Sequence, residues 1–474
     1  MKAVGTKWIW ASALLLSAVI GCGGDASSKN EVASNKKSAP TSNSPARPLP
    51  FGRKAADNQP GRISTDGAEK GGDASASSPM APQPFFPTAD IPAGVIAARN
   101  MEPPPLSERH DLLAGWIHLF NGVSLFGWTP QTKANWTATG GVITASEGEP
   151  GLLTTNMEFG DYHLRVDFRT MTPDANSGVF LHTVDNPGRD DVTTRCYEVN
   201  IAPDSNPFPT GSIVGRVKST HSFNTEHWCS LEAKVEGGRV MIFVNGQLTA
   251  DYTDPRPLRR GKIGLQFNSG EVQFREIKLR PLGLGPFSKG GGQDGWKLDP
   301  AGKAALEVSP EGILRLRGGK GYLESERQFK DFVLQAEIRT NRENQNSGIF
   351  FRTIPGSEMM GYECQIHNGI QNGQPLDCGT GGIFRRQEAY FMPARDRQWF
   401  ALTLICHDAH MGAWVNGIQV TDWTDDRPAD ENPRKGKRLD AGTIQLQGHD
   451  ADTDVSFRQF RIAEMAPREE PATP

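Results

Sequence analysis

The chain has 474 residues, which is long for one domain and suits two, because domains usually hold about 50–250 residues. Its 55 acidic residues slightly outnumber its 51 lysines and arginines, which gives a net charge of −4 at pH 7. Without a basic surplus the protein has no field that would attract nucleic acid, so a nucleic-acid-binding function is excluded.

The first 22 residues have the pattern of a lipoprotein signal peptide. Lys2 and Lys7 precede an apolar run, Trp8 to Ile20, that is shorter than the roughly 20 residues needed to span a bilayer. The run ends in Gly21-Cys22, which resembles a bacterial lipobox, and several acyl chains on Cys22 would give a stable anchor. We therefore predict an exported, membrane-anchored lipoprotein, periplasmic or at the cell surface. The alternative is a plain secretory signal with a chance cysteine.

Residues 23–105 are rich in Ser, Pro, Gly, Ala and Asn and poor in large apolar side chains. Such a composition buries too little surface to offset the entropy of ordering the chain. The segment is predicted to be a disordered tether.

Two blocks of the remaining chain repeat one pattern. Phe159-Gly-Asp-Tyr-His-Leu-Arg-Val-Asp-Phe-Arg-Thr170 is matched by Phe329-Lys-Asp-Phe-Val-Leu-Gln-Ala-Glu-Ile-Arg-Thr340, and Asn176-Ser-Gly178 by Asn346-Ser-Gly348. The spacing is 170 residues in both cases, from 329 − 159 and 346 − 176. Solenoid and propeller units repeat at roughly 20–50 residues, so this longer period indicates a duplicated domain. We predict a first copy at 106–283, a second at 284–466 and a tail at 467–474.

Apolar and polar residues alternate within each copy. Tyr162 to Phe168 and Phe332 to Ile338 both have the period of two that is typical of half-buried strands. Asn245-Gly246 and Asn416-Gly417 each follow such a run and predict hairpin turns. No stretch sustains a helical period, so each copy is predicted to be an all-β antiparallel sandwich of jelly-roll type.

Five cysteines follow Cys22, and only Cys196 and Cys364 occupy matching places in the two copies. An odd, unpatterned set without a C-x-x-C pair argues against a disulfide framework and against a thiolate metal site. No cofactor and no metal ligand are predicted from these residues, and the use of a divalent metal ion is left open.

Several motifs together resemble the 3-keto-disaccharide hydrolase domain family, also known as DUF1080. In the first copy they are Trp116-Ile-His-Leu-Phe-Asn-Gly122, Gly127-Trp128, Asn176-Ser-Gly178 and Tyr197-Glu-Val-Asn-Ile201. In the second they are Gly321-Tyr-Leu323, Asn346-Ser-Gly348, Tyr362-Glu-Cys-Gln-Ile366, Trp399, Leu446-Gln-Gly-His449 and Phe457-Arg458. The resemblance implies two tandem concanavalin A-like (lectin/glucanase) sandwiches. It also implies cleavage of glycosides whose sugar is oxidised to a 3-keto form.

The candidate site residues lie on one face of the second copy. Alternation puts Tyr362, Cys364 and Ile366 on the core face and leaves Glu363, Gln365 and His367 on the other. Arg352, and Arg385 or Arg386 after Gly381-Gly382, are expected to reach the same face. A C3 ketone acidifies the proton on C2, which Glu363 or His449 is predicted to remove, and Arg352 and Arg386 are the candidates for stabilising the enolate. Loss of the C1 substituent and addition of water then give net hydrolysis without the carboxylate pair of ordinary glycosidases. Substrate contacts are predicted for Gln365, His367 and Gln447.

Each of these assignments has a structural alternative. Glu363 can pair with Arg352 as a solvated ion pair, and His449 can be a turn residue. In the first copy the candidates Glu198, His182 and Arg216 remain, but Asn268 replaces His449 at the end of the matching strand. We therefore predict catalysis in the second copy, with the first weakened or substrate-holding. A non-catalytic carbohydrate-binding lipoprotein is the competing function, and the oligomeric state is left open.

Overall fold

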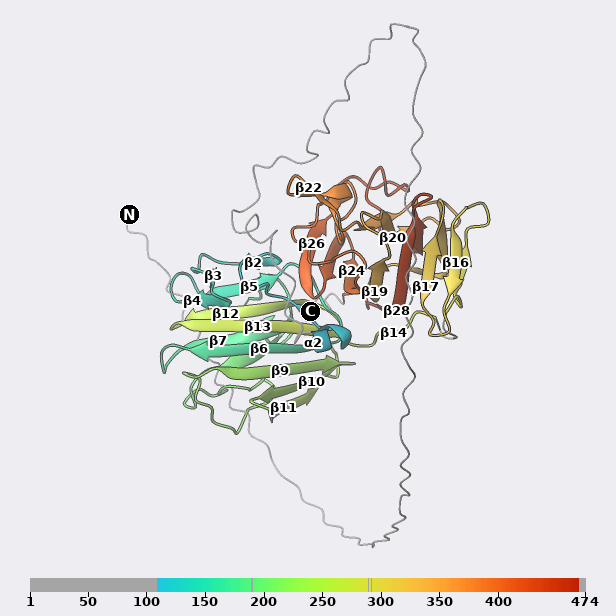
Figure 1. Cartoon of the computed structure of the whole chain (residues 1–474). Helices are drawn as coiled ribbons and strands as arrows, with labels where there is room; N and C mark the ends of the chain where they lie inside the picture. The colour runs from blue at the N-terminus through green and yellow to red at the C-terminus, as the bar shows by residue number, and fades with distance from the viewer. Residues whose placement is uncertain (1–108, 189–190, 289, 291, 469–474) are drawn as a thin grey trace, which may run out of the picture. The chain divides into compact units, whose positions relative to one another are not determined.

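The computed structural model describes residues 109–188, 191–288, 290 and 292–468 (Figure 1). The predicted signal peptide, Cys22 and the tether lie outside the described residues. Within the described ranges, no helix is long and apolar enough to cross a membrane.

The first copy consists of one short helix and many strands. They are α2 Arg109–Leu113, β1 Ile117–His118, β2 Trp128–Pro130, β3 Thr137–Thr139, β4 Val142–Ala145, β5 Gly151–Thr155, β6 Tyr162–Thr170, β7 Asn176–Thr183, β8 Tyr197–Ile201, β9 Cys229–Glu236, β10 Arg239–Val244, β11 Gln247–Thr253, β12 Lys262–Ser269 and β13 Val272–Pro281.

The second copy repeats this series. Its elements are β14 Gly285–Pro286, β15 Trp296–Leu298, β16 Ala305–Val308, β17 Leu314–Arg317, β18 Gly321–Phe329, β19 Phe332–Thr340, β20 Ser347–Thr353, β21 Tyr362–Ile366, β22 Ile370–Gln371, β23 Gln374–Pro375, the 3₁₀ turn η4 Leu376–Cys378, β24 Phe400–His407, β25 His410–Val415, β26 Ile418–Thr424, β27 Gly442–Gly448 and β28 Asp454–Glu464.

Each copy is a sandwich of an eight-stranded and a five-stranded sheet. The larger sheets run β11-β10-β9-β6-β13-β4-β3, with β1 on β13, and β16-β17-β28-β19-β24-β25-β26, with β14 on β28. The smaller sheets run β2-β5-β12-β7-β8 and β15-β18-β27-β20-β21. The prediction of two tandem all-β sandwiches is confirmed.

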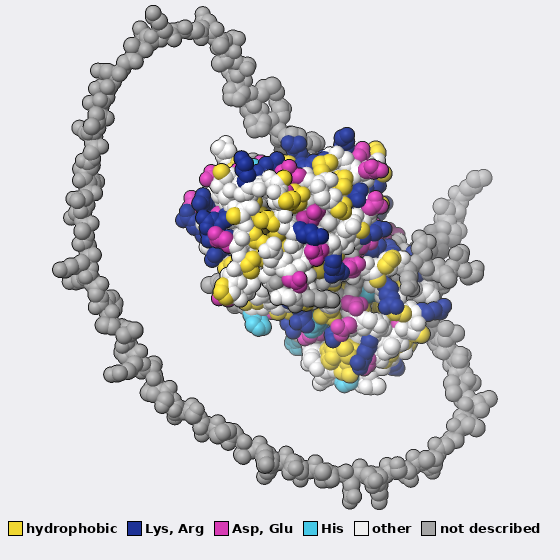
Figure 2. Space-filling view, turned by 90° about the vertical axis from the view of Figure 1, so that its right-hand side faces the viewer, with side chains coloured by type: hydrophobic (Ala, Val, Ile, Leu, Met, Phe, Trp, Pro, Cys, Tyr) yellow, Lys and Arg dark blue, Asp and Glu magenta, His cyan; other side chains and the backbone are white. Residues whose placement is uncertain are grey.

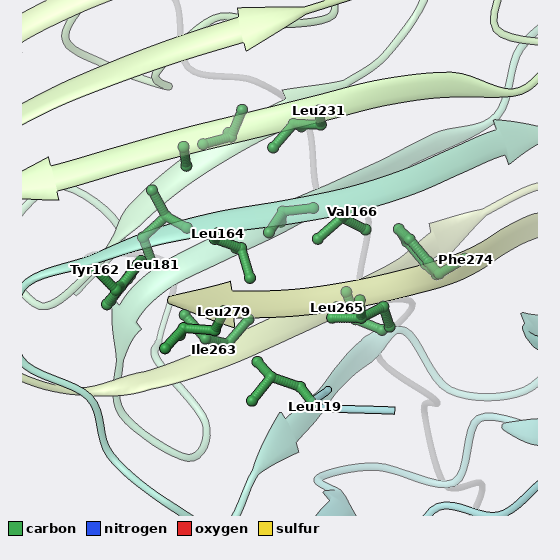
Figure 3. Packing of buried hydrophobic residues seen from close by; sticks show 14 of the residues in the cluster. Leu119, Tyr162, Leu164, Val166, Leu181, Leu231, Ile263, Leu265, Phe274 and Leu279 are labelled. Atoms are coloured by element: carbon green, nitrogen blue, oxygen red, sulfur yellow. The ribbon is translucent and has the colours of Figure 1, made fainter. Parts of the chain in front are cut away.

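Alternation along the strands builds the core, as the sequence predicted. Tyr162, Leu164, Val166 and Phe168 on β6 are fully buried against the facing sheet, and Figure 3 shows several of these side chains packed between the strands. On the equivalent strand β19, Phe332, Leu334, Ala336 and Ile338 are buried in the core of the second copy. Burial of apolar area at about 25 cal/mol per Å² is the main stabilising contribution in both.

Polar and apolar contacts join the two copies. Trp414 of the second copy packs with the core of the first and donates its indole N–H to His118 O at 3.1 Å. Arg260 of the first, whose side chain is 3% exposed, pairs with Glu158 of its own copy and with Asp331 and Asp408 of the second. These contacts agree with the grouping of both copies into one compact unit. The two copies are therefore in direct contact and are not joined by the Gly-rich connection alone.

Candidate functional site

The outward face of the five-stranded sheet of the second copy carries two rows of polar and aromatic residues. Strand register aligns Glu324, Gln445, Phe350 and Glu363 in one row. Tyr322 lies opposite Gln447, and Gly348 opposite Gln365, in the neighbouring row. The face that the alternation of β21 predicted as polar is therefore polar. It is not open to solvent, however, because Glu363, Gln365 and His367 are all buried.

Glu363 is the carboxyl that β21, the edge strand of this sheet, contributes to the face. Its side chain is 7% exposed. Burial raises the pKa of Glu363 from 4.5 to about 8, and the attraction of Arg434 opposes that rise only in part. Gly348 lies next to the Glu363 side chain, on the neighbouring strand β20. A Cβ atom at position 348 would lie 2.8 Å from Glu363 Oε1, so only glycine leaves enough space for the carboxyl group. A protonatable group with a pKa near the operating pH is suited to general acid–base chemistry.

Three arginines and Glu363 line a small cavity of about 50 Å³. Arg385 and Arg386 lie on a turn that backbone hydrogen bonds fasten to β21, Phe384 N–H to Glu363 O among them. Arg434 places Nη2 at 3.9 Å from Glu363 Oε2 and donates its Nε–H to Met359 O.

Amide and imidazole groups extend the site along the second row. Gln365 donates to Asn346 Oδ1 at 2.9 Å, while Gln447 Nε2 contacts Met359 Sδ. The Oε1 atoms of Gln365 and Gln447 and the Nε2 atom of His367 are buried without a hydrogen-bond partner among the described residues. Leaving buried polar atoms unpaired costs free energy, so they are candidates for hydrogen bonds to a ligand.

The structure does not bring Arg352 to this site. Its side chain is 0% exposed and donates hydrogen bonds to the carbonyls of Lys330, Asp408 and Arg438 and to Asp331 Oδ1. It does not pair with Glu363, so the predicted solvated ion pair between them is absent too. The matching His182 is likewise buried, with its ring nitrogens 2.8 Å from the carbonyls of Leu258 and Gly160. The Arg352 and His182 side chains therefore both contact backbone carbonyl groups at places where separate segments of the chain meet.

His449 lies at the end of β27, with its side chain 43% exposed and Nδ1 2.9 Å from Asp450 Oδ2. It does not line the cavity of Glu363. Of the four predicted catalytic residues, the structure therefore places Glu363 and Arg386 together and Arg352 and His449 elsewhere.

The first copy keeps the framework but not the cations. Phe180 lies opposite Glu198, and Gln266 opposite Gly178, which repeats the rows of the second copy. Burial raises the pKa of Glu198 to about 7, while a hydrogen bond from Gln266 acts in the opposite direction. Leu152, Phe180, Val192 and Cys196 form an apolar cluster on this face. Arg216 does not serve Glu198, because it stacks on Tyr197 and donates to the carbonyls of Val192 and Thr193.

Sequence reasoning missed Arg434. It lies in a segment of 16 residues between Asp425 and Gly442 (442 − 425 − 1), where the first copy has 6 between Asp254 and Gly261 (261 − 254 − 1). The length difference between the copies was the available signal, since an insertion beside a polar strand is a common source of functional side chains. Among the described residues, no group of three or more His, Cys, Asp or Glu is placed to hold a metal ion.

A family model described as the 3-keto-alpha-glucoside-1,2-lyase-like domain matches residues 115–280 and again residues 287–463. The chain belongs to this family. Both copies are therefore domains of a family named for carbohydrate chemistry, in agreement with the resemblance drawn from the sequence motifs. No curated protein matches the chain significantly.

Solved structures with a similar fold each cover about one copy. One is a protein of Parabacteroides distasonis provisionally described as a glycosyl hydrolase, with 22% identity, a TM-score of 0.31 and coverage of 35% of this chain and 99% of that one. Another is the carbohydrate-binding module CBM66 of Bacillus subtilis, with 15% identity, a TM-score of 0.26 and coverage of 35% and 93%. A third is the β-glucanase of Bacillus licheniformis, with 14% identity, a TM-score of 0.25 and coverage of 35% and 96%.

Proposed function

We propose that the second copy cleaves 3-keto-glycosides by removing the proton next to the ketone. The observation that carries this proposal is the buried Glu363 carboxyl, whose pKa is raised to about 8, in a cavity with three guanidinium groups. A carboxylate with so high a pKa is a stronger base than an exposed one, and it still titrates near neutral pH.

In the proposed reaction, Glu363 takes the proton from C2, and the electron pair of the C–H bond forms an enolate with the C3 carbonyl. Arg386, which lines the same cavity, stabilises the negative oxygen. When the carbonyl re-forms, the electron pair expels the C1 substituent, which leaves as an alcohol after taking the proton that Glu363 removed from C2. The sugar is left with a C1–C2 double bond. This step is the 1,2-elimination that the family description names.

Addition of water across the new double bond would complete a net hydrolysis. The hydroxyl group of the water joins C1 and its proton joins C2, so the balance needs neither an oxidant nor a covalent enzyme intermediate. Gln365 and Gln447, whose amide oxygens are buried and have no hydrogen-bond partner among the residues that the structure describes, are the proposed partners for sugar hydroxyls. His367, two residues after Gln365 in the chain, offers its ring Nε2 as a further partner.

The decisive experiment incubates the full chain with a 3-keto-disaccharide and with its unoxidised parent. Mass spectrometry should find the unsaturated or rehydrated sugar from the oxidised compound alone. Glu363→Gln keeps the shape but removes the base, and loss of a general base typically costs about 10²–10⁴-fold in rate. Glu198→Gln is the matched control in the first copy and should retain most of the activity. Cleavage of neither compound, together with measurable binding of glycans, would favour the competing carbohydrate-binding function.

We also propose that the protein is exported and lipid-anchored through Cys22, because signal, lipobox and tether follow one another in the sequence. Mass spectrometry of the mature N-terminus should find an acylated cysteine. An unmodified N-terminus at another residue would contradict the anchor.

A further inference from the structure

The two copies differ most in the charge around the same buried glutamate. Arg385 stands where the first copy has Gly215, and Arg434 lies in the segment that is ten residues longer in the second copy. The shared arginine, Arg216 or Arg386, is present in both. The second copy therefore has two more guanidinium groups around an otherwise similar pair of residue rows.

The backbone at Arg385 is held in a conformation that suits glycine. Its φ angle is 58°, and Gly215 at the matching place has a φ of 71°. Side chains with a Cβ atom are disfavoured in this left-handed region. Glycine therefore fits the backbone at this position without strain, and Arg385→Gly should be tolerated by the fold.

The added arginines have no full counter-charge in the protein. Among the described residues, Arg385 forms no ion pair and lies over the Phe384 ring at 5.2 Å, and the nearest carboxylate contact of Arg434 is 3.9 Å from Glu363. By contrast, Arg427 nearby makes a two-pronged pair with Asp425, at 2.8 Å for each bond. On the face that Figure 2 shows, positive and negative side chains lie interspersed, as on an ordinary solvated surface.

Arg386 adds to this local surplus. It donates to the carbonyls of Arg385 and Arg434 and has no carboxylate partner among the described residues. Burial and the nearby Arg427 lower the pKa of the Arg386 guanidinium, and the attraction of Asp425, which is already paired with Arg427, offsets this lowering only in part. An anion bound here would relieve that cost.

We propose that the second copy takes glycosides that carry a permanent negative charge, such as a carboxylate or a sulfate ester, and that Arg385 and Arg434 bind this group. The inference rests on the proposed function for the position of the sugar beside Glu363. Guanidinium groups bind carboxylate and sulfate oxygens through paired, charge-assisted hydrogen bonds. One enolate oxygen needs fewer cations than this cavity supplies, whereas an enolate and a fixed anion together would use all three.

Binding should be measured by calorimetry on the full chain carrying Glu363→Gln, so that no turnover is required. The probes are methyl glucoside, methyl glucuronoside and methyl glucoside 6-sulfate, each as both anomers. We expect an anionic probe to bind about tenfold more tightly than the neutral one, and this preference to shrink with added salt. Comparison of the affinities for the glucuronoside and the 6-sulfate shows which of the two anionic groups the site binds better.

Arg385→Gly restores the residue of the first copy and should fold, and together with Arg434→Ala it should remove the preference for the anion. Arg397→Ala removes an exposed cation outside the cavity and should leave the preference intact. Equal affinities for the three probes, no binding of any of them at millimolar concentration, or a preference that survives the double substitution would overturn the proposal. Cleavage of a neutral 3-keto-disaccharide without a preference for anions would support the proposed function and contradict the anion site. Binding of anions without cleavage would support the anion site and contradict the proposed function.

Discussion

Replacing Glu363 by glutamine should stabilise the fold while it abolishes activity. A carboxyl whose pKa rises from 4.5 to about 8 on folding is more costly to ionise in the native protein than in the unfolded chain. Glutamine has the same shape and no charge. A residue that weakens the fold at neutral pH is retained for another reason, and chemistry is the reason proposed for Glu363.

The size of the effect follows from linkage. Below pH 4.5 Glu363 is protonated in both states and costs nothing. As the pH rises from 4.5 to about 8, the unfolded chain loses the proton first, and stability falls by at most about 1.4 kcal/mol for each pH unit. The variant should therefore gain less than about 1 kcal/mol at pH 5 and up to about 3 kcal/mol at pH 7.

Urea unfolding of the wild type and of Glu363→Gln at pH 5, 7 and 8 measures this difference. Glu326→Gln, which removes an exposed carboxylate of the same copy, controls for the loss of one charge. A difference that does not grow with pH, or a variant less stable than the wild type at pH 7, would mean that Glu363 is ionised in the fold at little cost. Glu363 would then not be a strong buried base.

Three further substitutions separate structural from catalytic roles. Arg352→Met should lower the free energy of unfolding by about 3 kcal/mol or more and leave kcat per folded molecule unchanged, because it strands the buried partners of that guanidinium. Arg260→Met should cost about 3 kcal/mol and make calorimetric unfolding less cooperative, since its partners lie in both copies. His449→Ala should change kcat by less than about twofold, whereas loss of a true general base costs about 10²–10⁴-fold.

The alternation of apolar and polar residues predicted the sandwiches well, because each strand has one face in the core. The same pattern could not show that the second face of β21 is buried as well. That burial comes from turns and loops far along the chain, such as the one that carries Arg385 and the one that carries Arg434. The raised pKa of Glu363 depends on this cover. The sequence therefore predicted the glutamate as a candidate base without predicting its burial or its raised pKa.

Arg352 shows the opposite failure. Its place after Asn346-Ser-Gly348 suggested the polar face, but its φ of 49° breaks the alternation of β20 at that point. The register between β20 and β27 shifts between Phe350 and Thr353. The Arg352 side chain, which was expected on the surface of the sheet, therefore points into a junction between separate segments of the chain. A rule with a period of two cannot locate such an irregularity.

Duplication gives this protein an internal comparison for each step of the argument. Both copies keep a buried glutamate opposite a phenylalanine, and both keep a glutamine near it, so these features belong to the shared framework. Only the second copy adds Arg385 and Arg434 where the first has Gly215 and a short loop. If the shared framework alone sufficed for catalysis, Glu198→Gln and Glu363→Gln would each remove part of the activity. If the added cations are required, only Glu363→Gln will abolish it, and moving the longer segment into the first copy should be the first step toward a second active site.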